Sequence, residues 1–177
     1  WSGRVTSEAY NLEKFTVIYP PVNAPFTNVP WHEKKNRFLC ISRIVPEKRI
    51  DMVIQILKQV RARGYDVSLD IVGRPDNQDY YQLITELCKE NRSWLLFHGL
   101  QDRLGLARLM GECKYGINGL VEEPFGIAIA EMVKAGCIVF VPNDGGQREI
   151  VGSNELTFND IEDAVDKISS VLTNEEL

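Results

Sequence analysis

Two sequence periods alternate from residue 38 to the end of the chain, and this alternation restricts the fold more than any other feature. Short apolar runs typical of strands occupy residues 38–42, 67–73, 95–99, 115–118, 137–141 and 156–158. Between them, apolar residues recur every three or four positions, as in amphipathic helices. These helical segments span residues 49–64, 78–91, 102–113, 127–136 and 161–172. The sequence therefore repeats a strand followed by a helix about five times.

The predicted strands carry no alternating polar face. FLCIS at 38–42 and CIVFV at 137–141 are almost entirely apolar. Strands of this kind are buried on both faces, as in parallel sheets that are covered by helices. We therefore predict an α/β fold with a doubly wound, Rossmann-like parallel sheet flanked by helices. Its ligand is expected beyond the carboxyl ends of the strands, where the loops gather.

The first part of the chain has a different character. Residues 1–37 hold polar patches, four of the eight prolines and one strand-like run, TVIYP at 16–20. We see no second core there. The sequence predicts an interdomain connection and edge segment over 1–28, which leads into an edge strand, and one Rossmann-like domain over 29–177.

Composition and charge narrow the class of protein. The chain has 177 residues, of which 44% are apolar, and a net charge of −5, which is typical of a soluble globular domain. The net charge argues against a nucleic-acid partner, because such proteins present a basic surface. No apolar run approaches the roughly 18 residues of a membrane span, and no signal peptide is visible.

Cysteine and histidine usage argues against a metal site. The four cysteines are Cys40, Cys88, Cys113 and Cys137. They form no CxxC pair, and the two histidines are far apart, so we expect no zinc site. We predict four free thiols in a reducing compartment, which the cytoplasm provides.

The loop after the first predicted strand, SRIVPEKRID at 42–51, lacks the GxGxxG pattern of dinucleotide-binding proteins. It contains Arg43, Lys48 and Arg49 instead. Arg43 and Lys48 can point over the sheet, so that their cations bind a phosphate in place of a glycine-rich cradle. The alternative is that the three basic residues are solvated surface.

The segment NGLVEEPFGIAIAEMVKAG at 118–136 places two carboxylates around the start of a helix. Pro124 suits a first helical turn, and Gly126 leaves room for an anion near free backbone N–H groups. Glu123 precedes the helix, and Glu131 lies inside it among apolar residues. A buried carboxylate needs a partner, and two ribose hydroxyls would serve. The alternative is that Glu131 pairs with Lys134 on a solvent-facing stripe.

Two further positions each allow two interpretations. The glycines of NDGGQREIV at 143–151 either bring backbone close to a ligand or form a plain turn. His98, at a predicted strand end, either faces the pocket or has a structural role.

The segments SRIVPEKRID, DIVG, LLFHGL, EEPFGIAIAEMVKAG and GGQREIV occur in this order from about residue 42 to 151. Together they resemble the C-terminal, nucleotide-sugar-binding domain of GT-B glycosyltransferases of family 4, the retaining type. The resemblance extends over residues 15–173, and its most specific element is the pair Glu123 and Glu131 joined to PFG. It implies the C-terminal half of a GT-B fold, and a YPPVN link between two domains.

The resemblance also implies a role for each candidate residue. Arg43 and Lys48 match the basic pair that holds the donor diphosphate, and Glu123 matches the glutamate that faces the transferred sugar. Glu131 matches the glutamate that binds the ribose. The remaining implied donor contacts are the backbone around Phe125, Gly126 and Ile127, the base-bordering segment His98 to Leu100, and Gly73 of DIVG.

For the whole protein, the resemblance implies a glycosyltransferase without a metal or other cofactor. The 124–136 run is most like mannosyltransferases that use GDP-mannose on a glycan or lipid-linked acceptor. A UDP-sugar donor is the main alternative, and a non-catalytic nucleotide-binding module is another. The family usually carries an N-terminal acceptor-binding domain, which we expect to be required for transfer. A lipid acceptor would bring the full-length protein to the cytoplasmic face of a membrane.

Overall fold

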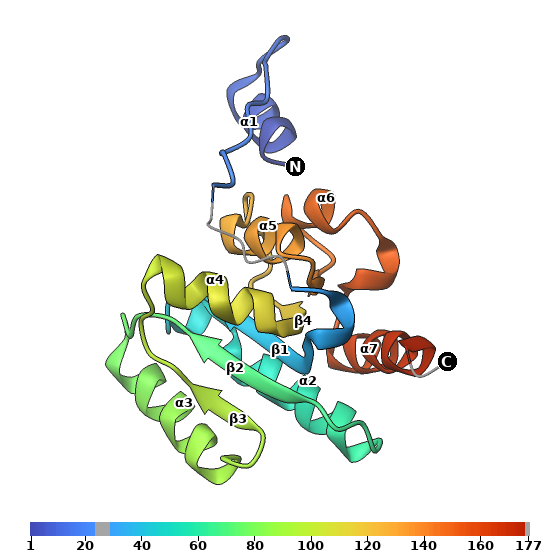
Figure 1. The fold of residues 1–177 in the computed structure, drawn as a ribbon. Coiled ribbons are helices and arrows are strands. Elements are labelled where there is room, and N and C mark those ends of the chain that lie inside the picture. Colours follow the sequence, from blue (N-terminus) through green and yellow to red (C-terminus); the bar gives the residue numbers. More distant parts are fainter. Residues whose placement is uncertain (24–28, 176–177) are drawn as a thin grey trace.

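The computed structural model describes residues 1–23 and 29–175 and contains one parallel sheet (Figure 1). Within these residues the sheet has six strands in the order β3-β2-β1-β4-β5-β6, and every neighbouring pair is parallel. The strands are β1 (Lys35–Ile41), β2 (Ser68–Val72), β3 (Leu95–Phe97), β4 (Cys113–Ile117), β5 (Ile138–Pro142) and β6 (Thr157–Phe158). The predicted doubly wound parallel sheet is confirmed.

The strand order reverses its direction between β1 and β4. β1 pairs with β2 on one side and with β4 on the other, and Phe38 lies opposite both Leu69 and Tyr115. Such a reversal opens a crevice at the carboxyl ends of the two strands. The expectation that the N-terminal connection leads into an edge strand is wrong, because β1 is the first strand of the chain and lies inside the sheet. Its side chains pack on both faces, which is why the run is apolar throughout.

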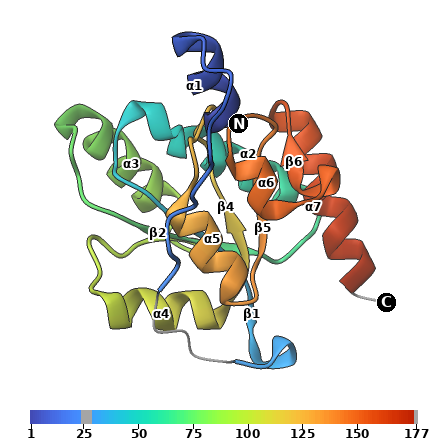
Figure 2. The same ribbon diagram turned by 90° about the horizontal axis from the view of Figure 1, so that it is seen from above.

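Helices cover both faces of the sheet (Figures 1 and 2). Side chains of α2, α3 and α7 pack on one face, and side chains of α4, α5 and α6 pack on the other. The helices are α1 (Ser2–Tyr10), α2 (Ile50–Ala62), α3 (Gln78–Glu90), α4 (Arg103–Glu112), α5 (Ile127–Lys134), α6 (Gln147–Val151) and α7 (Ile161–Glu175). Neither α1 nor α6 was predicted.

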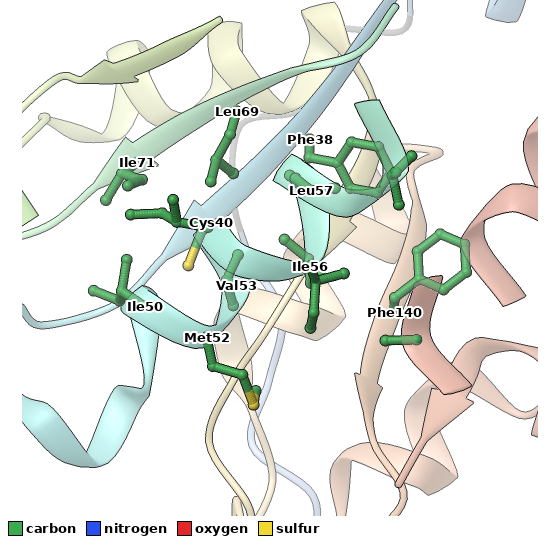
Figure 3. Packing of buried hydrophobic residues seen from close by; sticks show 14 of the residues in the cluster. Phe38, Cys40, Ile50, Met52, Val53, Ile56, Leu57, Leu69, Ile71 and Phe140 are labelled. Carbon is green, nitrogen blue, oxygen red and sulfur yellow. The ribbon is translucent and has the colours of Figure 1, made fainter. Parts of the chain in front are cut away.

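The spacing of apolar residues over 52–60 predicts the face of α2 that packs on the sheet. Figure 3 shows Val53, Ile56 and Leu57 of α2 in one buried cluster with Phe38 and Cys40 of β1. All are buried, together with the other residues of the predicted helix face. Burial of each large apolar side chain contributes about 1.5–3 kcal/mol, so this face fixes α2 and the turn that precedes it.

A buried ammonium joins the ends of two helices on the other face. Lys34 is buried, and its Nζ donates hydrogen bonds to the carbonyl oxygens of Met110 (3.0 Å), Cys113 (3.2 Å) and Ala135 (3.0 Å). These carbonyls lie where α4 and α5 end, and a cation there complements the helix dipoles. Lys34 therefore fixes the carboxyl ends of α4 and α5 relative to each other.

The N-terminal segment lies over the start of α5. Ser2 Oγ donates to the carbonyl of Pro124 (2.8 Å), and the Tyr19 ring packs on Phe125 with centroids 5.7 Å apart. The run 16–20, predicted as strand-like, forms no strand, and residues 24–28 of the predicted connection lie outside the described residues. No described helix has the length and apolar character of a membrane span. All four cysteines are free thiols, as predicted.

Candidate functional site

A cavity of about 370 Å³ lies at the carboxyl ends of β1 and β4, where the strand order reverses. Its walls come from the end of β1, the end of β4, the loop and first turns of α5, and the N-terminal segment. The lining residues are Pro20, Ile41, Lys48, Ile117, Asn118, Glu123, Pro124, Phe125, Gly126, Ile127, Ala128, Ile129 and Met132. We call this space the donor cavity, after the expectation from the sequence that a nucleotide-sugar donor binds here.

An ion pair crosses the donor cavity. Lys48 Nζ lies 2.9 Å from Glu123 Oε2, although the two residues are 75 positions apart in the chain. Both side chains are largely shielded, with 18% and 19% of their surface exposed. Two residues that the sequence singled out separately, one cation and one carboxylate, are therefore brought together here.

Close backbone packing places Lys48. It ends the short 3₁₀ turn Pro46–Lys48, and Arg49 follows in the left-handed conformation with φ 51° before α2 begins. A side chain at Gly119 would come within 2.6 Å of the Lys48 carbonyl oxygen. Glycine at 119 thus lets the loop after β4 lie directly on the turn that carries Lys48.

The two glycines of the 143–151 loop place Glu123. Gly146 N donates to the Glu123 carbonyl (2.8 Å), and a Cβ at Gly146 would be 2.2 Å from the Pro124 carbonyl oxygen. A Cβ at Gly145 would be 2.5 Å from the Glu123 carbonyl oxygen. The two glycines therefore bring backbone close to the 118–126 loop, and their approach to a ligand stays a prediction.

A buried side chain that sequence reasoning missed ties the same loops together. Gln147 is buried, and its Nε2 donates to the carbonyls of Leu120 (2.8 Å) and Asp144 (3.1 Å). Its Oε1 accepts a hydrogen bond from Asn118 Nδ2 (2.8 Å). A glutamine next to a glycine pair carries no recognisable signal in one sequence, so its role appears only in the fold.

The first turn of α5 opens into the donor cavity. Gly126 caps the helix with φ 92°, which a residue other than glycine adopts only with strain. The first N–H groups of a helix have no acceptor within it and carry partial positive charge. Since Gly126, Ile127 and Ala128 line the cavity, this helix start is available to an anion.

Glu131 lies farther along α5 and is half-buried. The apolar residues around it do not bury the helix on all sides, because Ile127 and Val133 are exposed and only part of α5 packs on the sheet. Within residues 1–23 and 29–175, the Glu131 carboxylate has no hydrogen bond or ion pair. Lys134 Nζ donates to the Val22 carbonyl (2.8 Å). The alternative that Glu131 pairs with Lys134 is therefore wrong, and the ribose contact of Glu131 stays a prediction.

Arg43 is not among the residues that line the donor cavity. Its side chain is 64% exposed, and its guanidinium lies 3.7 Å from Asp76 Oδ2 in the loop after β2. Arg74 also binds Asp76, and the hydrogen bond from Arg74 holds the pKa of that carboxyl below its usual value. In this structure Arg43 therefore belongs to an exposed cluster beside the site.

Three other predicted residues also lie outside the cavity lining. A side chain at Gly73 would collide with the Ser42 carbonyl oxygen at 1.7 Å, so packing against the end of β1 requires this glycine. His98 Nε2 lies 2.8 Å from Oδ1 of the buried Asp70, which supports the structural interpretation of His98. Leu100 is 70% exposed.

A second cavity of about 300 Å³ shares a wall with the donor cavity. It lies between the N-terminal segment and the residues Pro124 and Phe125, and Pro20 lines both spaces. Among the described residues there is no cluster of three His, Cys, Asp or Glu side chains able to hold a metal ion. The described ionisable side chains that line the donor cavity are those of Lys48 and Glu123.

The family model of the glycosyl transferases group 1 matches residues 25–177 of this chain. The match covers most of the sequence and includes every element that forms the donor cavity except Pro20. The chain therefore belongs to this family.

Curated relatives are distant and longer. The chain is 23% identical over 147 residues to the GDP-Man:Man(3)GlcNAc(2)-PP-Dol alpha-1,2-mannosyltransferase of Mus musculus, with 75% of this chain and 30% of that protein covered. It is 29% identical over 156 residues to an uncharacterized glycosyltransferase of Methanocaldococcus jannaschii, with 78% and 39% covered. The chain thus spans about a third of the length of the curated relatives it matches.

Solved structures agree with the fold. The pneumococcal O-GlcNAc transferase GtfA, in complex with UDP and GlcNAc, superposes with a TM-score of 0.76 at 15% identity, over 99% of this chain and 37% of that one. Anabaena HepE, in complex with UDP and glucose, gives a TM-score of 0.66 at 25% identity, over 82% and 41%. The architecture is that of the C-terminal half of a GT-B fold.

Proposed function

We propose that this chain is the donor-binding half of a retaining glycosyltransferase, and that the whole protein transfers a sugar from a nucleoside diphosphate to an acceptor. The observation that carries the proposal is the meeting of Lys48, Glu123 and the start of α5 in one cavity at the switch point of the sheet. Membership of the glycosyl transferases group 1 family supports the reaction type.

In this proposal the leaving diphosphate binds between Lys48 and the first turn of α5. Negative charge develops on the diphosphate as the glycosidic bond breaks, and a preorganised cation and helix N-terminus stabilise that charge. Arg43 adds a second cation after its exposed side chain moves away from Asp76, which lies 3.7 Å from its guanidinium. These groups do the work for which other enzymes use a metal ion.

Glu123 faces the transferred sugar, where it positions the ring or stabilises its positive charge. Glu131 binds the ribose hydroxyls, and its carboxylate, which has no ion pair among the described residues, is available to accept their hydrogen bonds. The base lies along the backbone of residues 98–100, because the His98 side chain is turned toward Asp70. Gly73 keeps the neighbouring loop close to β1.

We propose GDP-mannose as the donor and a glycan or lipid-linked acceptor. Relatives in mouse, Dictyostelium discoideum and Homo sapiens are GDP-Man-dependent alpha-1,2-mannosyltransferases that act on a PP-Dol compound. The alternative is a UDP-sugar, which the HepE complexes with UDP-glucose and with UDP and glucose favour. We further propose that an acceptor domain outside this chain is joined to it through residues 1–28. The proposed location of the whole protein is the cytoplasmic face of a membrane.

Calorimetric titration with GDP and UDP tests the donor site on this chain. Glu131→Gln removes the charge but keeps the shape, and we expect it to weaken nucleotide binding about fivefold through weaker hydrogen bonds to the ribose hydroxyls. Binding of a 2′,3′-dideoxy nucleotide should be the same in both proteins. Arg43→Gln should weaken binding about threefold.

Glu90→Gln is the matched control, since Glu90 is an exposed glutamate at the end of α3. It should leave both affinities unchanged. If Glu131→Gln and Arg43→Gln bind GDP and UDP as tightly as the unmodified chain, the assigned donor site is wrong. GDP binding well above UDP binding supports a mannosyl donor, and the reverse preference moves the donor to the UDP-sugars.

A further inference from the structure

The charges of the donor cavity cancel each other. Among the described residues that line it, Lys48 is the one cation and Glu123 the one anion, and they are paired at 2.9 Å. A diphosphate entering this cavity would meet a cation that is already occupied and a carboxylate of its own sign. Like charges at short range repel strongly where water is largely excluded.

The two side chains can separate without any change of backbone. Lys48 N is hydrogen-bonded to the Val45 carbonyl (3.0 Å), and the Glu123 carbonyl accepts from Gly146 N (2.8 Å). Glycines 119, 145 and 146 hold both backbones in contact with neighbouring loops. Rotation about side-chain bonds is therefore the available way to break the pair, and such rotations are fast.

We propose that the pair acts as a partner exchange: Lys48 leaves Glu123 for the donor diphosphate, and the released Glu123 turns toward the sugar. This inference rests on the proposed donor function of the cavity. In the empty site, Glu123 competes with the diphosphate for Lys48. When phosphate binds to Lys48, the Glu123 carboxylate is released.

The exchange also selects the class of ligand. A nucleoside without phosphate cannot replace the carboxylate at Lys48, so it leaves the ion pair intact. A nucleoside diphosphate supplies phosphate oxygens that bind the ammonium, and the N–H groups at the start of α5 donate hydrogen bonds to its other oxygens. Glu123 is therefore ready for the sugar only when a diphosphate is bound.

The test is a double-mutant cycle read out by calorimetric binding of GDP, UDP and inorganic pyrophosphate to the 177-residue chain. Glu123→Gln should raise the affinity for all three by about three- to tenfold, because it removes the competing charge. Lys48→Met should lower it at least tenfold. In Lys48→Met, adding Glu123→Gln should raise the affinity clearly less than it does beside Lys48, since it then removes only the direct repulsion and frees no cation.

Glu122→Gln is the matched control, because it removes the same charge one position earlier from an exposed side chain outside the cavity lining. It should change affinity less than twofold, and guanosine binding should be equal in every variant. Thermal unfolding of each variant establishes that it is folded.

The outcomes separate the two proposals. If neither the unmodified chain nor any folded variant binds a diphosphate, the donor site itself is wrong, and the exchange with it. If Lys48→Met weakens binding but Glu123→Gln leaves it unchanged or also weakens it, the donor site stands and the exchange is overturned. An equal gain from Glu123→Gln with and without Lys48 also overturns it, because such a gain would come from direct repulsion alone.

Discussion

The loop after β4 (residues 118–126, the β4 loop) and the loop after β3 (residues 98–102, the β3 loop) both contain predicted site residues, but they are held differently. Gly119, Gly145 and Gly146 bring three backbone segments into direct contact around the β4 loop. In the β3 loop, Gly99 has open space around it, and Leu100 projects into solvent. The β4 loop carries a charged side chain that must be aimed, whereas the β3 loop is proposed to offer only backbone to a flat base. Tight packing is thus found where a charge has to be placed.

The largest expected difference comes from adding one methyl group to each region. Gly146→Ala puts its Cβ 2.2 Å from a backbone oxygen of Pro124, so the loop must shift. We expect a loss of about 3 kcal/mol in the free energy of unfolding. Gly99→Ala meets no neighbour and costs about 1 kcal/mol, through its positive φ alone. Urea denaturation of the two variants measures both; equal losses would contradict the contrast.

A smaller effect is expected when the side-chain tie of the β3 loop is cut. His98→Leu removes the 2.8 Å contact to Asp70, which keeps its ion pair with Arg37 (3.3 Å). The free energy of unfolding should fall by about 1.5 kcal/mol. Nucleotide affinity should change less than twofold, because the side chain faces Asp70. A loss of affinity above tenfold in a folded His98→Leu protein would show that the imidazole itself contacts the donor.

The smallest effect is a change of stability that is absent at pH 7 and appears at high pH. It concerns two thiols, one on β1 and one on α3. Burial raises the pKa of Cys40 on β1 to about 12 and that of Cys88 on α3 to about 11. A raised pKa in the folded state stabilises the protein fully below the unfolded value of 9, and this stabilisation is lost as the pH rises toward 12.

The free energy of unfolding should therefore decline above pH 9, and less so in Cys40→Ala. In the folded protein at pH 10, iodoacetamide should modify the half-buried Cys88 before Cys40, as followed by mass spectrometry. Modification of Cys40 first would mean that the sheet beneath the donor cavity opens more readily than α3.

Much of the fold was predictable because it depends on local patterns. The apolar positions of 49–64 gave the buried face of α2, and unbroken apolar strands gave a parallel sheet. The place of β1 inside the sheet was not predictable, since it depends on which strands pair across long connections. The helix α6 was missed because its five residues are too few to show a period.

The identity of the candidate site residues could be predicted from the sequence, but the contacts between their side chains could not. Glu123 and Lys48 stood out because each is a charged residue in a loop between a predicted strand and a predicted helix. Their 2.9 Å contact, however, joins two loops that are 75 residues apart in the sequence. Lys34 and Lys35 are adjacent lysines, yet one is buried among three carbonyls and the other is exposed beside Glu112. Only the tertiary structure distinguishes them. The same holds for Arg43, whose partner Asp76 comes from another loop.

The strand order also determines when the donor cavity can exist during synthesis. Lys48 follows the first strand made, but its partner follows β4, after β2, α3, β3 and α4 have been translated. Contacts between such distant parts of the chain form late in folding, because closing the intervening loop costs entropy. A nascent chain that ends after α4 contains the residues of β1, β2 and β3 and Lys48, but not yet Glu123. The proposed nucleotide site can therefore form only after the start of α5 has been made, and nucleotide binding would report on both halves of the sheet.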